Sequence, residues 1–119
     1  ATYQLIPAMR RSQMHSRVGR AGEAIYGTRV GEIAAELAMH FEEGNDGPRA
    51  VRYLLQAAEN ARYRSAHHEA ETLCRRGLSA LVGLPPSPER DQRELDLRTI
   101  LGASTLALEG YAADGVQDV

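Results

Sequence analysis

Two short stretches carry residues whose types and spacing could do chemistry. In LAMHFEEGNDG, His40 lies one helical turn after Glu36 and just before Glu42 and Glu43. Such a cluster could bind a metal or transfer a proton, but metal sites need three or four converging ligands. On a helix, His40 would flank the buried face while both following glutamates point to solvent. We therefore expect a helix surface here.

The second stretch contains His67, His68, Glu71 and Cys74. His67, Glu71 and Cys74 share one helical face at steps of four and three, and their side chains are all possible ligands of a transition metal. The alternative is that Cys74 is a small core residue and the histidines border a turn. We favour that alternative and expect no resident metal.

Signatures of an enzyme are missing from the sequence. No Ser or Cys lies in a recognisable nucleophile elbow or beside a marked partner base, and no GxxxxGK[ST] loop is present to hold phosphates. We therefore expect no catalytic residue and no cofactor site in this segment.

The charge distribution leaves one alternative open. The net charge is −2, yet Arg10, Arg11, Arg17 and Arg20 cluster near the beginning of the chain with Glu23 as the one acidic neighbour. Such a cluster could contact the phosphates of DNA or RNA. We favour a solvated face, because the chain has few aromatic residues for stacking on bases and a negative total charge. Nucleic acid is therefore an unlikely partner on this interpretation.

Cellular context follows from cysteine usage and hydropathy. The single cysteine excludes an internal disulfide framework and fits a reducing compartment. No apolar run approaches the roughly 20 residues that span a bilayer, and the first residues do not have the layout of a signal peptide. We expect a cytoplasmic protein with no membrane partner. Because the chain begins at Ala1 and ends at Val119 without a closing element, we also expect a fragment of a larger protein.

The composition favours helices. Hydrophobic residues make up 43% of the chain, with no Trp and one Phe, so small and aliphatic side chains must build the core. Apolar spacing and helix-breaking residues predict a single all-α domain with five helices, at about 8–26, 30–44, 48–64, 67–82 and 88–109. Residues 1–7 are interpreted as the tail of a preceding linker, and a truncated sixth helix is expected from about 112.

Several details of these helices can be specified. The first should bury Met14, Val18, Ala21 and Ile25, which recur at steps of four, three and four. The third has two adjoining apolar stripes and must contact two neighbours. The expected helix ends are Gly27, Gly44 and Gly110, and the expected N-caps are Asp46, Ser65 and Ser87.

One hairpin resembles the tetratricopeptide repeat. The match lies in the small and large residues at the intervals of that pattern, namely Leu37, Ala38, Phe41, Ala50, Leu54 and Ala57. The resemblance implies antiparallel helical hairpins stacked as a right-handed superhelix. A second frame uses Ala57, Ala58, Ala61, Ala70, Cys74 and Gly77, and Leu101-Gly102 could open a further repeat. The two frames differ over which helix comes first in each pair.

The resemblance also implies a binding surface. In a tetratricopeptide array, the first helix of each pair lines a concave groove. By this resemblance the candidate groove residues are Glu32, Ala35, Met39 and Glu42, joined by Arg52 and Glu59 if the second frame holds. The alternative is that all six are ordinary surface residues.

A more specific resemblance covers nearly the whole chain. Four stretches occur in this order: MRRSQMHSRVGRAGEAIYG, VGEIAAELAMHFEEGNDGPRAVRYLLQAAENARYRSAHHEAETLCRRGLSAL, LPPSPER and LGASTLALEGYAADGV. They resemble the helical region that follows the ATPase core in bacterial signal-transduction ATPases with numerous domains, which include predicted ATPases fused to cyclases, kinases or DNA-binding transcription regulators. The resemblance implies a non-catalytic sensor segment that docks a protein or peptide partner or another domain of the same chain.

Two other functions remain open from the sequence. The segment could be a free-standing tetratricopeptide adaptor, or it could bind nucleic acid through the Arg-rich first helix. Because a fragment of a helical array exposes apolar end faces, self-association of this piece is also expected.

Overall fold

The computed structural model describes the backbone of residues 2–117 and the side chains of residues 6–110. The elements are α1 (Thr2–Tyr26), a 3-10 helix η1 (Gly27–Ile33), α2 (Ala34–Glu43), α3 (Gly47–Tyr63), α4 (His67–Leu81) and α5 (Pro88–Gln117). No strand occurs within residues 2–117. The predicted all-α class is therefore confirmed.

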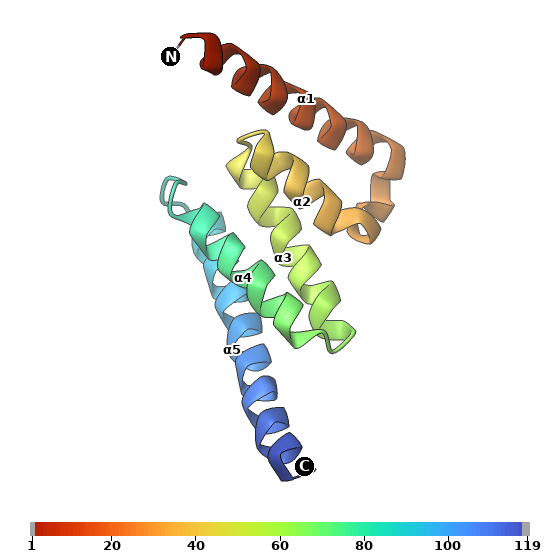
Figure 1. Cartoon of the computed structure of the whole chain (residues 1–119), viewed down its shortest axis with the longest axis vertical. Helices are drawn as coiled ribbons and strands as arrows, with labels where there is room; N and C mark the ends of the chain where they lie inside the picture. The colour runs from red at the N-terminus through yellow and green to blue at the C-terminus, as the bar shows by residue number, and fades with distance from the viewer. Residues whose placement is uncertain (1, 118–119) are drawn as a thin grey trace.

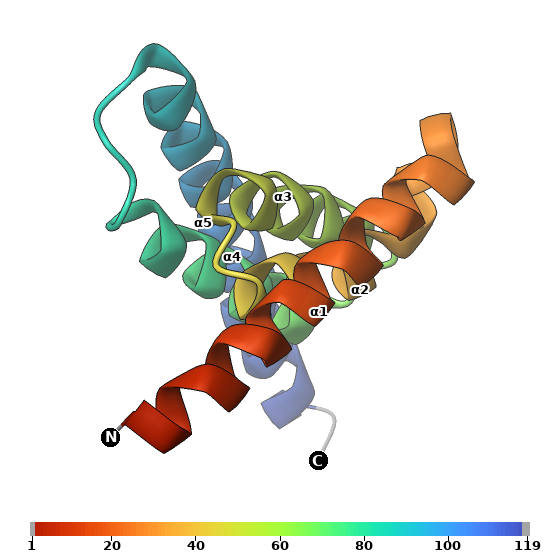
Figure 2. The same cartoon turned by 90° about the horizontal axis from the view of Figure 1, so that it is seen from above.

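The helices form a stack in which each packs against the next along the chain (Figure 1). The long α1 lies at one end and the long α5 at the other, so the structure measures 56 × 34 × 34 Å. Helix α3 packs against α2, α4 and α5, whereas the backbone of α1 lies close to α2 and η1 alone within the described residues and reaches α3 through the side chain of Glu23. Seen from above, α1 lies across one side of α2, and α4 and α5 lie on the opposite side of α2 (Figure 2). Helix α3 is therefore the centre of the fold.

The core confirms the two apolar stripes predicted for the third helix. The seven stripe residues of α3 are all buried, and so is Tyr53. They are Ala50, Leu54, Ala57 and Ala61 on one stripe and Val51, Leu55 and Ala58 on the other. Every residue used for the repeat resemblance is at most 5% exposed, namely Leu37, Ala38, Phe41, Ala50, Leu54 and Ala57. The small side chains let α2 and α4 approach the α3 backbone closely, and Phe41 fills the remaining space.

Two predicted N-caps are confirmed and one is wrong. Asp46 accepts a hydrogen bond from the Arg49 N–H at 3.2 Å, and Ser87 accepts one from the Arg90 N–H at 3.0 Å. Ser65 does not cap α4, because its backbone has φ 60° and belongs to the end of α3. The N–H of Ala66 bonds back to the carbonyl of Ala61 at 2.8 Å, as in a left-handed helix C-cap.

The helix boundaries at the two ends of the chain differ from the predictions. Helix α1 begins at Thr2 rather than at residue 8, with Pro7 inside it at the start of its second turn. Helix α5 continues through Gly110 to Gln117, so the predicted sixth helix is part of α5. A glycine inside a helix costs only about 1 kcal/mol and did not end this one. Residues 118 and 119 lie outside the described part.

The second predicted helix is also shorter than expected. Gly27 ends α1 as predicted, with φ 53°. Residues 27–33 then form the 3-10 helix η1, and α2 begins at Ala34 rather than at residue 30. Val30 and Ile33 still pack against the edge of the core, which explains why they continue the apolar spacing of α2.

The predicted buried face of the first helix is wrong. Met14, Val18 and Ile25 are 62%, 45% and 79% exposed, and Ala21 is exposed too. Helix α1 instead packs through a narrow face of small residues. A Cβ on Gly19 would lie 2.7 Å from the ring of Phe41, so the α1 backbone approaches α2 as closely as a glycine permits.

The contact between α4 and α5 yields a testable pair of substitutions. A Cβ on Gly77 would lie 2.9 Å from both methyl groups of the buried Leu97. Overpacking should outweigh the gain in helix propensity, so we expect Gly77→Ala to lower the free energy of unfolding by about 1 kcal/mol. A Cβ on Gly102 in α5 would meet no neighbouring side chain within 4 Å. Gly102→Ala should therefore raise the free energy of unfolding by about 0.5–1 kcal/mol. Urea unfolding followed by circular dichroism measures both, and effects of the same sign would contradict the packing described.

Candidate functional site

A groove follows α3 along most of its length. It consists of three neighbouring hollows of about 210, 540 and 630 Å³, met in this order from the beginning of α3 to its end. The first two hollows share Arg93, and the last two share Glu59. We call this channel the α3 groove. At 1.5 Å per residue, the 17 residues of α3 span about 25 Å.

The first hollow is the apolar end of the α3 groove. Val51, Leu81, Leu84 and Pro85 line it, under the loop that joins α4 to α5, and Glu89 and Arg90 from the start of α5 border it as well. The side chain of Arg93 lies at its edge, where it also borders the middle hollow. Within residues 6–110, no carboxylate lies within ion-pair distance of Arg93. A charged donor therefore stands beside an apolar pocket.

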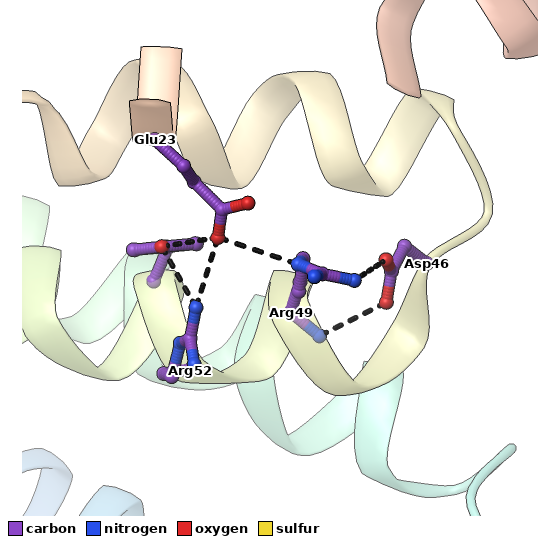
Figure 3. Close-up of polar contacts among 5 residues, drawn as sticks. Glu23, Asp46, Arg49 and Arg52 are labelled. Carbon is purple, nitrogen blue, oxygen red and sulfur yellow. Dashed lines mark hydrogen bonds and ion pairs between the residues drawn. The ribbon is translucent and has the colours of Figure 1, made fainter. Parts of the chain in front are cut away.

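The middle hollow is bordered by a polar network centred on Glu23 of α1 (Figure 3). One carboxylate oxygen, Oε2, accepts hydrogen bonds from the Tyr53 hydroxyl at 2.6 Å, from Arg52 Nη2 at 2.9 Å and from Arg49 Nε at 3.3 Å. Arg49 also pairs with Asp46 at 2.9 Å. The network joins the end of α1 to the exposed side of α3, and it balances two arginines with two carboxylates.

The protonation of this network suits binding rather than proton transfer. Burial raises the pKa of the Tyr53 hydroxyl, and its hydrogen bond to Glu23 raises it further, while Arg52 opposes both effects. The hydroxyl therefore stays protonated at neutral pH and donates to the carboxylate. The pKa of Arg49 is also raised, chiefly by its hydrogen bond to Asp46, so the guanidinium keeps its charge.

A second set of side chains joins η1 to α3 beside the same hollow. Gln56 donates to the side-chain oxygen of Asn60 at 3.0 Å, and Asn60 donates to the carbonyl of Gly31 at 2.8 Å. Gln56 and Gly31 both line the middle hollow. The wall formed by η1 is therefore held in place by α3 itself.

The structure separates the six groove residues expected from the sequence into two groups. Arg52 and Glu59 line the α3 groove. The other four lie on or beside α2 and do not line any of its three hollows: Glu32 pairs with Arg29 at 2.7 Å, Ala35 and Met39 are exposed, and Glu42 pairs with Arg76 of α4.

Several groove residues had no signal in the sequence. Glu23, Tyr53 and Arg93 come from three different helices, and the contact between Glu23 and Tyr53 joins residues 30 positions apart. The one sign was that Glu23 is an isolated acidic residue among arginines. For Tyr53 and Arg93, the spacing of apolar residues carries no information about such a contact.

The candidate metal clusters do not assemble. The Nδ1 atom of His40 lies 3.0 Å from Nδ1 of His15 on α1, so His40 contacts another helix rather than its neighbouring glutamates. Glu71 accepts a hydrogen bond from the Thr105 hydroxyl at 2.8 Å, and Cys74 is fully buried. Among the side chains of residues 6–110, no three His, Cys, Asp or Glu side chains converge.

The Arg-rich surface of α1 is exposed to solvent, as the sequence predicted. Arg10, Arg11, Arg17 and Arg20 all face solvent. They lie away from the α3 groove, which they do not line. No helix in the described part of the chain is long and apolar enough to cross a membrane.

Comparison of the chain with family models, curated proteins and solved structures finds no match.

Cys74 provides a test of the buried interface between α4 and its neighbours. Burial raises the pKa of the Cys74 thiol to about 11, with the charge of Arg75 opposing the shift and that of Glu71 adding to it. Because the thiolate is the reactive form, we expect native protein to react with DTNB at neutral pH far more slowly than protein unfolded in urea. Stoichiometric labelling of the native protein at the unfolded rate would contradict this burial.

Proposed function

We propose that this chain is a non-catalytic protein-interaction and regulatory segment of a larger cytoplasmic signalling ATPase or transcription regulator. The observation that carries the proposal is the α3 groove, which joins an apolar pocket to a charged channel along one helix. An extended protein segment is the ligand that fits such a channel. At about 3.3 Å per residue, some seven or eight ligand residues would cover the length of α3.

The chemistry of the groove supports a peptide ligand. The apolar pocket of about 210 Å³ has room for one aliphatic or aromatic side chain. Beyond it, the side chains of Arg93, Arg52 and Gln56 offer hydrogen-bond donors, and Glu59 offers an acceptor. Both signs of charge occur along the channel, which suits the backbone and mixed side chains of a protein better than a polyanion.

The helix contacts support a tetratricopeptide-like arrangement. In such an array the first helices of successive pairs lie side by side on the concave face. Helices α3 and α5 contact each other here, whereas no Cα atoms of α2 and α4 lie within 8 Å. We therefore infer that α3 and α4 form one pair and that α5 opens the next, in a right-handed superhelix. The α3 groove would then be its concave face.

Regulation by this segment requires a difference in affinity. A bound segment can bias an attached catalytic domain only if it binds one state of the whole protein more tightly than the other. The fold offers a route, because α1 and α5 both border the groove and lead towards opposite ends of the chain. A ligand that contacts Glu23 and Arg93 together would fix both helices relative to α3.

The parent gene tests the attachment to an ATPase. We expect the coding sequence upstream, in the same reading frame, to encode a GxxxxGK[ST] phosphate-binding loop. Sequencing through both flanks decides the point. A gene that encodes helical repeats and no such loop would refute the attachment and leave a free-standing adaptor, for which the α3 groove would still be the binding site.

The groove itself is tested by selecting octapeptides from a displayed random library on the immobilised chain. Arg93→Gln should weaken the selected peptides about tenfold, since one lost charge-assisted contact costs about 1.4 kcal/mol. Arg75→Gln removes the same charge from the exposed side of α4 and should change nothing. Fluorescence anisotropy with labelled peptides measures both. Equal losses in the two variants, or selection of no peptide at all, would contradict the proposed site.

A further inference from the structure

Four charged side chains line the middle hollow of the α3 groove, and they differ in whether the chain itself neutralises them. Glu23 and Arg52 pair with each other at 2.9 Å (Figure 3). Arg93 and Glu59 line the same hollow, and within residues 6–110 neither of them forms an ion pair. The middle hollow therefore offers a ligand one unpaired charge of each sign.

The two unpaired charges lie at opposite ends of the middle hollow. Arg93 also borders the first hollow, whereas Glu59 also borders the third. The other charged residues continue the same order. Those of the first hollow are Arg90, Arg93 and Glu89, and those of the third hollow are Glu59, Asp96 and Arg62. The α3 groove is therefore basic beside its apolar pocket and acidic at its far end.

The arginines near Arg93 are already occupied by the chain. Arg52 donates to the Glu23 carboxylate at 2.9 Å and to the Tyr53 hydroxyl at 2.8 Å. Arg90 donates to the carbonyl of Leu81 at 3.1 Å and pairs with Glu94 at 3.6 Å. A ligand carboxylate would have to compete with these contacts, whereas at Arg93 it would replace only water. Arg93 is therefore the donor that an acidic ligand residue would meet.

The length of α3 between the two ends sets the spacing of the ligand residues. Val51 lines the apolar pocket, and Glu59 follows it by eight positions, which is about 12 Å along the helix. An extended peptide rises about 3.3 Å per residue, so about four residues cover this distance. Alternate side chains of an extended peptide point to the same side. Three side chains, at every second position, would therefore face the groove.

We propose that the α3 groove recognises an extended peptide in which an apolar residue, an acidic residue and a basic residue follow one another at every second position. The apolar side chain enters the pocket of about 210 Å³, the carboxylate pairs with Arg93, and the basic side chain pairs with Glu59. The order applies whichever way the peptide backbone runs. This inference rests on the proposed peptide-binding function and adds the chemical class of the peptide.

The charges of the peptide test the order on the wild-type chain. Octapeptides selected on the immobilised chain should share the apolar, acidic and basic residues at alternate positions. In a labelled copy of one such peptide, exchange of the acidic and basic residues should weaken binding at least about tenfold, because each would then face a like charge. Fluorescence anisotropy measures both peptides. Selected peptides that lose affinity in Arg93→Gln but tolerate the exchange would overturn this order and leave the proposed function standing. Selection of no peptide would overturn both.

Reversal of the protein charges tests the two assigned residues. The chain with both Arg93→Glu and Glu59→Arg should bind the exchanged peptide at least about tenfold more tightly than the original one, because both contacts become favourable again. The control Arg75→Glu, on the exposed side of α4, should keep the preference of the wild-type chain. Circular dichroism melts establish that each variant is folded. A reversed chain that still prefers the original peptide would overturn the assignment, as would a reversed preference in the control.

Discussion

The structure depends on the burial of α3 from two sides at once. Its two alanine- and leucine-rich stripes are covered by α2 on one side and by α4 on the other, with α5 closing the second side. Only one strip of α3 remains, and it carries Arg49, Arg52, Gln56 and Glu59, at steps of three, four and three. Because this strip is the floor of the middle hollow, the placement of the polar side chains follows from the packing of the apolar ones.

The sequence predicted α3 and α4 to within a residue because both are bounded by turns and have one consistent apolar period. The prediction from the sequence failed where close helix packing or a positive φ, and not apolar spacing, determines the structure. Apolar spacing finds a stripe on α1 but cannot reveal which neighbour covers it, and close approach through Gly19 and Gly22 leaves no hydrophobic signal. The apolar spacing of α2 runs back into η1, where the positive φ of Gly27 sets a tighter helix instead.

The α3 groove was predicted less well than the helices that form it. Arg52 and Glu59 were selected by the spacing of the second repeat frame. Glu23 and Arg93 were not, since their place in the groove depends on how α1 and α5 cross α3, and no short-range pattern specifies a crossing. Of the other four candidates, Glu32, Ala35 and Met39 are exposed, whereas Glu42 is half-buried and pairs with Arg76 of α4; none of the four lines the α3 groove.

The contacts of α1 also affect how the molecule opens. Because the backbone of α1 packs on α2 and η1 and is joined to α3 through Glu23, α1 can separate while α3, α4 and α5 keep their shared core. The first surfaces uncovered would be those of Phe41 and Leu37, against which Gly19 and Gly22 pack. Backbone amides of α1 should therefore exchange their hydrogens through a partial opening that costs less than global unfolding. A ligand that binds Glu23 or the exposed apolar side chains of α1 would make that opening rarer. The rate of hydrogen exchange in α1 would then show whether either surface is occupied.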